Sequence, residues 1–247
     1  MRDFILITCE HGGNRIPAAY RSFFQASQEL LDSHHGYDIG ALVVAKELSA
    51  TFAAPLITST TSRLLIDLNR SIGHPNLHSE AVRAAPKSVR QQIIEQHYVP
   101  YRSKAEGIVS EAIANGSRAV HISSHSFTPE LDGKVRNCDI GLLYDPARAG
   151  EVALCERWKA AIEARAPHIR VRRNYPYAGT GDGLTRLLRS RFTADCYVGI
   201  ELEVNQKYAI AGSSAWMSVR KALIGSLQTA LRVSEAAFAN RPSFANR

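Results

Sequence analysis

Three side chains that suit the binding of an acid, Arg63, Asn69 and Arg70, lie within one stretch of eight residues. Arginine presents a planar fork of N–H donors that can form two parallel hydrogen bonds with a carboxylate. Asparagine adds a neutral amide beside these charges. The stretch therefore predicts a binding site for a short acidic molecule, and a reaction centre has to be sought beside it.

Two histidines are the candidates for that centre. His11 lies in a glycine-rich turn, Cys-Glu-His-Gly-Gly-Asn, and His125 lies in Ser-Ser-His-Ser. Neutral imidazole is a common zinc ligand, and a carboxylate often completes the set. The wide spacing matches no short metal-binding motif. Two interpretations therefore stay open for each histidine, a zinc ligand or a structural side chain bonded to the backbone.

The third ligand has two candidates. Asp38 precedes an expected helix, where it could ligate a metal or merely cap the helix. Asn14 follows His11 by three residues, but a neutral amide oxygen is a weaker zinc ligand than a carboxylate. The choice favours Asp38 and leaves Asn14 open.

A pair of carboxylates in an apolar strand is the candidate for a general base. Glu201 and Glu203 alternate with apolar residues in the run Tyr-Val-Gly-Ile-Glu-Leu-Glu-Val and so face the same way. Buried carboxylates are costly unless they are paired, hydrogen-bonded or near a metal. One of them could take a proton from a zinc-activated water. The alternative is an edge strand with one face in solvent.

A long glycine-rich loop at residues 174–183 contains Tyr177. Its hydroxyl could contact substrate if the loop covers the site. The loop lacks the Lys-Ser/Thr pair of a phosphate-binding loop. A plain connecting loop is the alternative.

The elements that must position these groups alternate between strand and helix. The expected strands cover residues 4–9, 55–60, 64–68, 119–123, 139–144 and 197–204, with an extended segment at 169–173. The expected helices cover residues 39–51, 87–115 with an interruption at Pro100, 148–166, 183–191 and 215–239. This pattern predicts one α/β domain, residues 1–247, with a mainly parallel sheet covered by helices on both faces and a frayed end at 240–247. In such sheets functional residues gather at the carboxyl ends of the strands.

Composition and charge narrow the range of possible binding partners. The formal charge is +7 and the isoelectric point about 9.4, which favours an anionic ligand. The basic residues are dispersed, which argues against nucleic-acid binding. Four scattered cysteines indicate reduced thiols rather than disulfides. We see no leader and no apolar run of membrane-spanning length, and therefore expect a cytoplasmic protein without a membrane partner.

Several of these motifs occur in one order that resembles the N-formylglutamate amidohydrolases. They are His-Gly-Gly-Asn-Arg-Ile-Pro from His11, then Asp38, Ser-Arg with Asp-Leu-Asn-Arg at 62–70, Ser-His-Ser around His125, and Glu203. The resemblance spans about residues 3–220 and extends to aspartoacylases and the zinc carboxypeptidase-like fold. It implies a mixed, mainly parallel sheet with helices on both faces, of the phosphorylase/hydrolase-like kind. Carboxypeptidases and aspartoacylases have a glutamate ligand where this chain has Asn14, whereas Asp38 matches a recurrent aspartate of the amidohydrolases.

The resemblance completes the expected mechanism. We expect one zinc ion held by His11, Asp38 and His125, with Glu203 as the base and Arg63 stabilising the oxyanion. The expected substrate-binding residues are Arg63, Asn69, Arg70 and Tyr177. The substrate would be a small anionic N-acyl amino acid such as N-formylglutamate, cleaved at its amide bond. The alternatives are a metallo-carboxypeptidase or peptidoglycan-fragment amidase on the same fold, which would need a longer cleft, and a non-catalytic protein that binds small acids.

Overall fold

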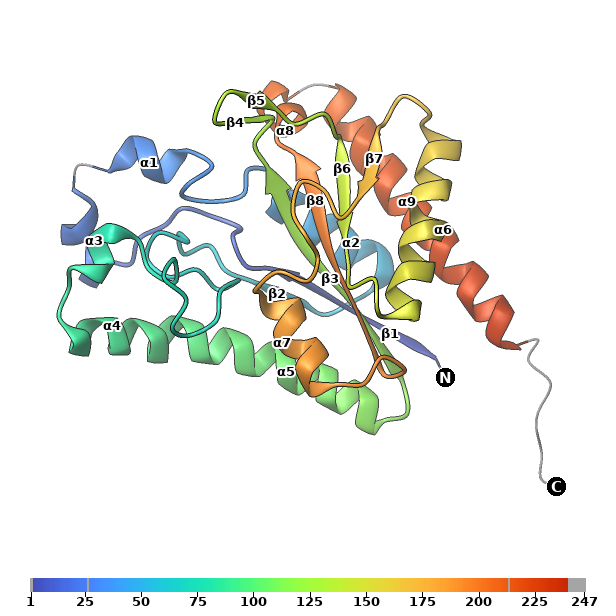
Figure 1. Cartoon of the computed structure of the whole chain (residues 1–247), viewed down its shortest axis with the longest axis horizontal. Coiled ribbons are helices and arrows are strands. Elements are labelled where there is room, and N and C mark those ends of the chain that lie inside the picture. The colour runs from blue at the N-terminus through green and yellow to red at the C-terminus, as the bar shows by residue number, and fades with distance from the viewer. Residues whose placement is uncertain (1, 26, 213, 240–247) are drawn as a thin grey trace.

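A six-stranded sheet runs through the centre of the computed structural model, which describes residues 2–25, 27–212 and 214–239 (Figure 1). The strands, in their order across the sheet, are β2 (Leu56–Thr58), β1 (Asp3–Cys9), β3 (Arg118–Phe127), β8 (Tyr197–Asn205), β6 (Ile140–Leu143) and β7 (Val171–Arg173). The first four are parallel, and β6 and β7 are parallel to each other. Because β6 runs antiparallel to β8, the sheet is mixed and mainly parallel, as expected.

Helices cover both faces of this sheet. On one face lie α2 (Ala41–Phe52), α6 (Ala149–Arg165) and α9 (Ser214–Ala239), and on the other lie α5 (Val99–Ala114) and α7 (Leu184–Arg191). Each face has its own cluster of buried apolar side chains. The expected α/β arrangement is confirmed.

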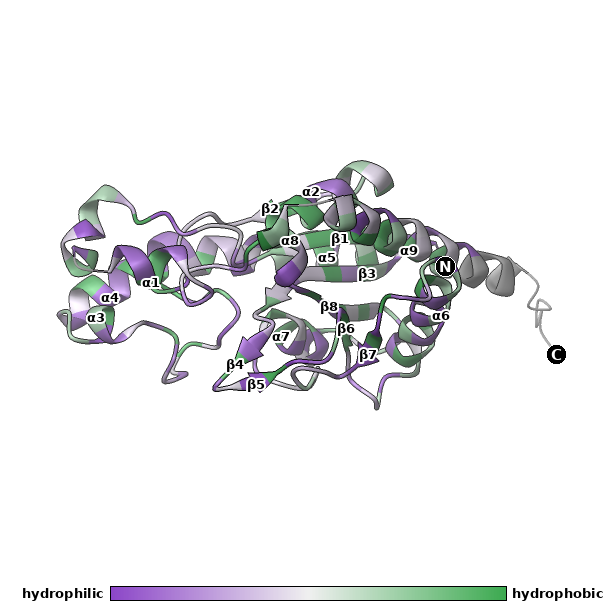
Figure 2. Ribbon diagram, turned by 90° about the horizontal axis from the view of Figure 1, so that it is seen from above, coloured by the Kyte–Doolittle hydropathy of each residue, from purple (hydrophilic) through white to green (hydrophobic). Residues whose placement is uncertain are grey.

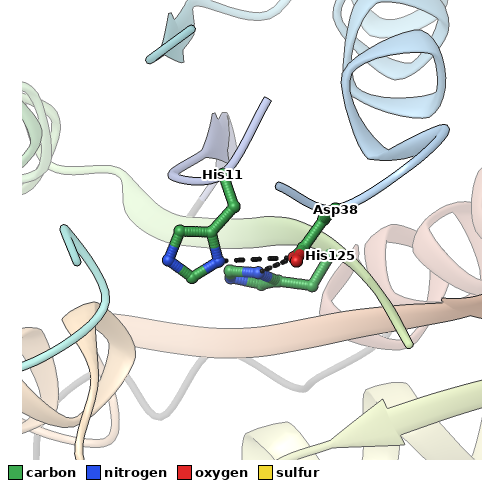
Figure 3. Close-up of side chains that lie close together, drawn as sticks. All are labelled: His11, Asp38 and His125. Atoms are coloured by element: carbon green, nitrogen blue, oxygen red, sulfur yellow. Dashed lines mark hydrogen bonds and ion pairs between the residues drawn. The ribbon is translucent and has the colours of Figure 1, made fainter. Parts of the chain in front are cut away.

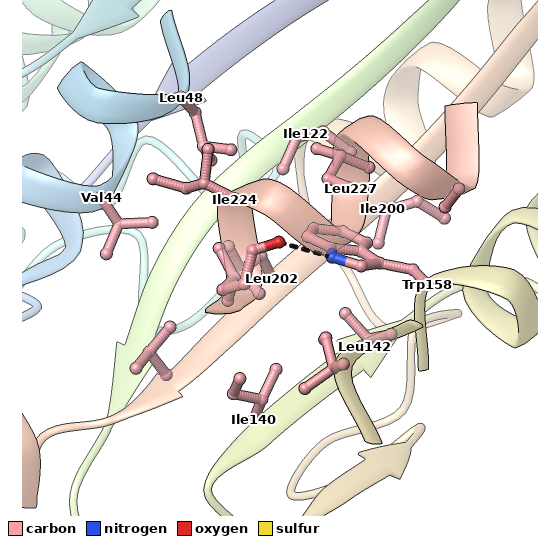
Figure 4. Packing of buried hydrophobic residues seen from close by; sticks show 14 of the residues in the cluster. Val44, Leu48, Ile122, Ile140, Leu142, Trp158, Ile200, Leu202, Ile224 and Leu227 are labelled. Carbon is pink, nitrogen blue, oxygen red and sulfur yellow. Dashed lines mark hydrogen bonds between the residues drawn. The ribbon is translucent and has the colours of Figure 1, made fainter. Parts of the chain in front are cut away.

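Trp158 shows how the first of these clusters is built. Its fully buried ring on α6 packs among aliphatic side chains from the sheet and from α9 (Figure 4). Its indole N–H donates to the carbonyl of Leu223, 3.0 Å away, so the single polar atom of the ring is satisfied. The contact fixes α9 against α6 and closes this face of the sheet.

Two expectations about the chain between β2 and β3 are wrong. Residues 64–68 form turns and not a strand, although Leu65 and Ile66 are buried. A short apolar run is equally compatible with a strand and with a buried turn. The helical region is not interrupted at Pro100, because α4 (Lys87–Ile93) passes through the π-helical turn η2 (Ile94–Tyr98) into α5. Pro100 lies at the start of α5, directly after the π-helical turn, and the change of hydrogen-bond register there accommodates its missing N–H.

The remaining elements are short. They are η1 (Ala18–Phe24), α1 (Gln28–Asp32), α3 (Glu80–Arg83), the hairpin β4 (Glu130–Leu131) and β5 (Lys134–Val135), and α8 (Lys207–Ala211). Helices α1, α3 and α4 gather at the end of the molecule remote from α9 (Figure 1). Polar and apolar residues mix in these three helices, whereas the central strands are mostly apolar (Figure 2). All four cysteines are free thiols. Within the described ranges no helix has both the length and the apolar character needed to cross a membrane. The expected frayed end at 240–247 lies outside the described residues.

Candidate active site

The predicted chemical groups meet where β1, β3 and β8 end. His11 follows the last residue of β1, and His125 lies near the end of β3. His125 is paired in register with Glu203 on β8, so both side chains occupy the same part of the carboxyl edge. Gly12 and Gly13 pass within van der Waals distance of residues 59–60, where a Cβ atom would collide with backbone carbonyl groups. This close approach fixes the turn that carries His11.

His11, Asp38 and His125 form a compact buried cluster (Figure 3). Oδ2 of Asp38 lies 2.8 Å from Nδ1 of His125 and 3.4 Å from Nδ1 of His11. One potential ligand atom from each residue lies within 4.8 Å of the other two. The capping interpretation of Asp38 is wrong, because α2 starts after Gly40 and has no side-chain cap. The carboxylate instead faces the two imidazoles.

A second carboxylate stands behind each imidazole. Nε2 of His11 is 2.7 Å from Oδ1 of Asp67, and Nε2 of His125 is 3.0 Å from Oε2 of Glu10. A carboxylate can only accept, so each Nε2 carries a proton directed at Asp67 or Glu10. Both Nδ1 atoms face Asp38. Carboxylates that orient metal-binding histidines in this way are a regular feature of metal centres.

This arrangement fits a bound cation. Burial lowers the pKa of His125, but Asp38 and Glu10 outweigh it and hold that pKa well above its ordinary value. The site therefore favours positive charge between the imidazoles and Asp38, as protons or as a metal ion. Two imidazoles and one carboxylate are also the donor set of many catalytic zinc sites.

Glu203 and Glu201 lie in different surroundings, although they share one face of β8. Oε2 of Glu203 is buried without a hydrogen-bond partner. Burial is the main reason that its pKa is raised to about 8, against the opposing charge of His125. Oε1 of Glu201 accepts a hydrogen bond of 2.5 Å from the Thr185 hydroxyl. The edge-strand interpretation is wrong, because β8 lies between β3 and β6.

Gly141 on β6 is paired in register with Glu203 and determines how closely the loop at 174–183 can approach the sheet beside Glu203. A Cβ atom at Gly141 would collide with the Tyr175 carbonyl oxygen and come within 3.2 Å of the Glu203 Cβ. Only glycine lets the loop at 174–183 lie directly on the sheet beside Glu203.

The predicted substrate-binding residues Arg63, Asn69 and Arg70 lie close to the cluster, and part of each side chain makes structural contacts. Arg63 pairs with Asp67 at 2.8 Å and approaches Asp38 at 3.3 Å. Oδ1 of Asn69 accepts the first N–H of α7, from Leu184, at 2.7 Å, while Nδ2 is 3.5 Å from Nε2 of His125.

Arg70 is anchored at one end of its guanidinium. Nη1 donates to the Asp182 carbonyl at 2.8 Å, while Nε is buried without a partner. Part of the guanidinium is therefore held in place and part remains available to a ligand.

A cavity of about 320 Å³ joins these groups. Its lining includes His11, Asp38, Arg63, Asn69, Arg70, His125, Tyr177, Glu201 and Glu203. Tyr177 stands at the rim, 46% exposed, and its hydroxyl accepts a hydrogen bond of 2.9 Å from Arg136. Asn14 lies elsewhere: its amide donates to Asp32 and it lines a different cavity. The structure thus brings together all the predicted site residues and separates Asn14 from them.

The sequence and the fold agree with one known family. A family model for N-formylglutamate amidohydrolase matches residues 4–209. The chain belongs to the N-formylglutamate amidohydrolase family. It is a hydrolase that acts on amide bonds.

Two solved structures share the fold of this chain. A gene product of Agrobacterium tumefaciens is 30% identical, with 94% of this chain and 91% of that chain covered and a TM-score of 0.80. An N-formylglutamate amidohydrolase from Ralstonia eutropha is 17% identical, with coverage of 98% and 96% and a TM-score of 0.67. No protein with a curated functional description matches the sequence.

Two residues of this amidohydrolase site were not recognised as site residues from the sequence. Glu10 is adjacent to His11 along the chain but orients the distant His125. Asp67 belongs to the Asp-Leu-Asn-Arg motif, yet its contact with His11 joins residues 56 positions apart. Both carboxylates lie next to recognised motif residues, and this position was the available signal of a role in the site. The histidines that they contact could be identified only from the folded chain.

Proposed function

We propose that this protein is a zinc-dependent amidohydrolase that cleaves small acidic N-acyl amino acids such as N-formylglutamate. The observation that carries the proposal is the convergence of His11, Asp38 and His125 beside the unpartnered carboxylate of Glu203, in a chain of this family. The residues of the cluster would hold the ion through Nδ1 of each histidine and through Oδ2 of Asp38. Zinc, when bound there, supplies a Lewis acid that polarises the scissile carbonyl and lowers the pKa of water.

Glu203 is the proton carrier in this proposal. Glu203 lines the same cavity as the three potential ligands, and its Oε2 has no hydrogen-bond partner. A pKa near 8 leaves the group able both to accept and to release a proton near neutral pH, and a nearby cation favours the carboxylate. Glu203 therefore takes a proton from the attacking water and returns it to the nitrogen of the leaving amine. Glu201 already accepts a hydrogen bond from Thr185, so it has a supporting role beside Glu203 and does not carry the proton.

The arginines and the amide bind the substrate. Arg70 has an unpartnered buried Nε, and Asn69 turns its Nδ2 toward the cluster, so both suit a substrate carboxylate. Arg63 reaches Asp38 and suits the oxygen that becomes negative at the scissile carbonyl. Tyr177 contributes a hydroxyl from the rim of the cavity. The net charge of +7 favours encounter with an anion.

Metal analysis with a matched pair of variants tests the proposal. We expect about one equivalent of zinc per chain and activity that a chelator removes. Asp38→Ala should lower zinc affinity strongly, while Asn14→Ala, which removes the competing candidate, should leave it close to wild type. A double His11→Ala, His125→Ala variant that still retains stoichiometric zinc would refute the ligand set.

A substrate panel tests the reaction itself. N-formyl, N-acetyl and dipeptide derivatives of glutamate, aspartate and a neutral amino acid should be compared by kcat/KM. We expect the acidic derivatives to be preferred, since Arg70 and Asn69 face the site. Loss of this preference would contradict the assignment of the substrate class.

A further inference from the structure

A second cavity, of about 480 Å³, adjoins the proposed catalytic cavity and shares Asp38, Arg63 and Arg70 with it. One wall comes from Leu30 on α1 and His34 just after it, and from His78 and Ser79 just before α3. The end of β3 and the β4 strand form the opposite wall. Figures 1 and 2 show α1 and α3 together at the end of the molecule that carries this wall. Small-molecule sites run from about 300 to about 1,000 Å³, so the first cavity alone suits a small acid and the pair suits a longer ligand.

Unsatisfied polar atoms are concentrated on this second cavity. Nine buried side-chain nitrogen or oxygen atoms lack a hydrogen-bond partner among the residues that the structure describes. Four of them belong to residues of its lining: His34 Nε2, Arg70 Nε, His78 Nε2 and Ser79 Oγ. Buried polar groups nearly always have partners, so this concentration points to a polar ligand.

His78 defines what kind of ligand fits. The side chain is buried, with 7% of its surface exposed, and Nδ1 lies 2.8 Å from the carbonyl oxygen of Leu65. A carbonyl oxygen can only accept, so Nδ1 carries the proton. Burial lowers the pKa of His78, which keeps the ring neutral and leaves a lone pair on Nε2. The unpartnered atom therefore needs an N–H or O–H donor, which a simple carboxylate lacks.

The two cavities also have an order relative to the scissile bond. Asn69 lines only the smaller cavity, where it and Arg70 are proposed to hold the carboxylate of the amino acid. Arg70 lines both cavities, so a carboxylate held from the side of Asn69 leaves the acyl group, across the scissile bond, free to extend into the larger cavity.

We propose that the larger cavity is an acyl subsite, which takes an acyl group longer than formyl that carries an N–H donor, as an N-acylated aminoacyl group does. This inference rests on the proposed function, because it assumes hydrolysis of an N-acyl amino acid at the adjoining centre. It extends the proposed substrates from N-formylglutamate to acidic amino acids that carry a short peptide-like acyl group, with the N–H of that group bound to Nε2 of His78.

A substrate pair with matched variants tests the subsite. N-acetylglycyl-L-glutamate and N-formyl-L-glutamate release the same amino acid and differ only in the acyl group. His78→Phe keeps a ring and removes the acceptor. His97→Phe is the control, because His97 Nε2 is also buried and unpartnered but belongs to neither cavity lining. The ratio of kcat/KM for the long over the short substrate should fall about tenfold in His78→Phe, the size of one lost hydrogen bond, and stay constant in His97→Phe.

A second variant covers the case in which His78→Phe does not fold. Leu30 lines the larger cavity and is 43% exposed, so Leu30→Trp can fill the cavity without disturbing the core. It should lower the same ratio. An unchanged ratio in Leu30→Trp, or equal ratios in His78→Phe and His97→Phe, overturns the subsite.

Binding separates this inference from the proposed function. In the background of Glu203→Gln, calorimetry should show N-acetylglycyl-L-glutamate binding more tightly than N-formyl-L-glutamate, and His78→Phe should abolish the difference. Wild-type protein that hydrolyses neither compound would refute the proposed function, while the calorimetric difference would still support the subsite. Equal dissociation constants for the two ligands would overturn the subsite whatever the activity.

Discussion

Replacing Glu10 by glutamine is expected to weaken metal binding without removing a proposed metal ligand. The Glu10 side chain is fully buried, and its Oε2 accepts from His125 at 3.0 Å and from Ser123 at 2.7 Å. Burial raises the pKa of Glu10, but its contacts with His125 outweigh this and lower that pKa, so the group is an anion in the fold. Glutamine keeps the shape and removes the charge that orients His125 and makes it more basic. Loss of such a partner raises the dissociation constant of the metal roughly 10–100-fold, or roughly 1.4–2.7 kcal/mol.

Competition with a chromophoric chelator at fixed pH measures this constant. Tyr101→Phe is the control, because the Tyr101 hydroxyl donates to Oε1 of Glu10 at 3.0 Å and its loss leaves the charge in place. We expect Tyr101→Phe to bind metal much as wild type does. The reasoning is refuted if Glu10→Gln binds metal as tightly as wild type, or if Tyr101→Phe loses as much affinity as Glu10→Gln.

Three further outcomes are expected. Glu203→Gln should retain metal and lower kcat by roughly 10²–10⁴-fold, while Glu201→Gln should be milder; near-normal kcat in Glu203→Gln would remove it as the base. Arg70→Ala should reduce kcat/KM for an acidic substrate by the equivalent of roughly 2–5 kcal/mol and cost much less for the matching carboxamide; equal losses would make Arg70 structural. Burial is the main cause that lowers the pKa of His121 to about 4, so the unfolded chain binds more protons below about pH 6.5, and stability should fall between about pH 6.5 and 4 by roughly 3 kcal/mol. Urea unfolding at several pH values should show that the free energy of unfolding depends less on pH in His121→Asn than in wild type. The same pH dependence in both proteins would contradict this.

The sequence predicted the site where local pattern decides position. His11 and His125 follow recognisable apolar strands, and parallel strands bring their carboxyl ends to one edge. Asn69 and Arg70 reach the same edge by a different route, because residues 64–68 form turns and not the strand that their apolar character indicated. Burial, and not backbone form, is what such a run encodes.

Other features depend on contacts that no local pattern reveals. The partners of Glu10 and Asp67 lie far away along the chain, on β3 and in the turn after β1. Likewise, His34 and His78 line one cavity only because the segment after α1 and the start of α3 meet in the fold. Their residue types are common in ordinary loops, so no local pattern connects them with the site.

The glycine at position 141 has a consequence for protein engineering. Because Gly141 lets the loop that carries Tyr177 lie directly on the sheet, one wall of the site is set by backbone contacts that no side-chain substitution can reshape without collision. The opposite wall is built from side chains, among them Leu30 and Ser79, on short elements at the end of the molecule. Libraries that seek altered acyl selectivity should therefore randomise the wall of Leu30 and Ser79 and keep Gly141 constant.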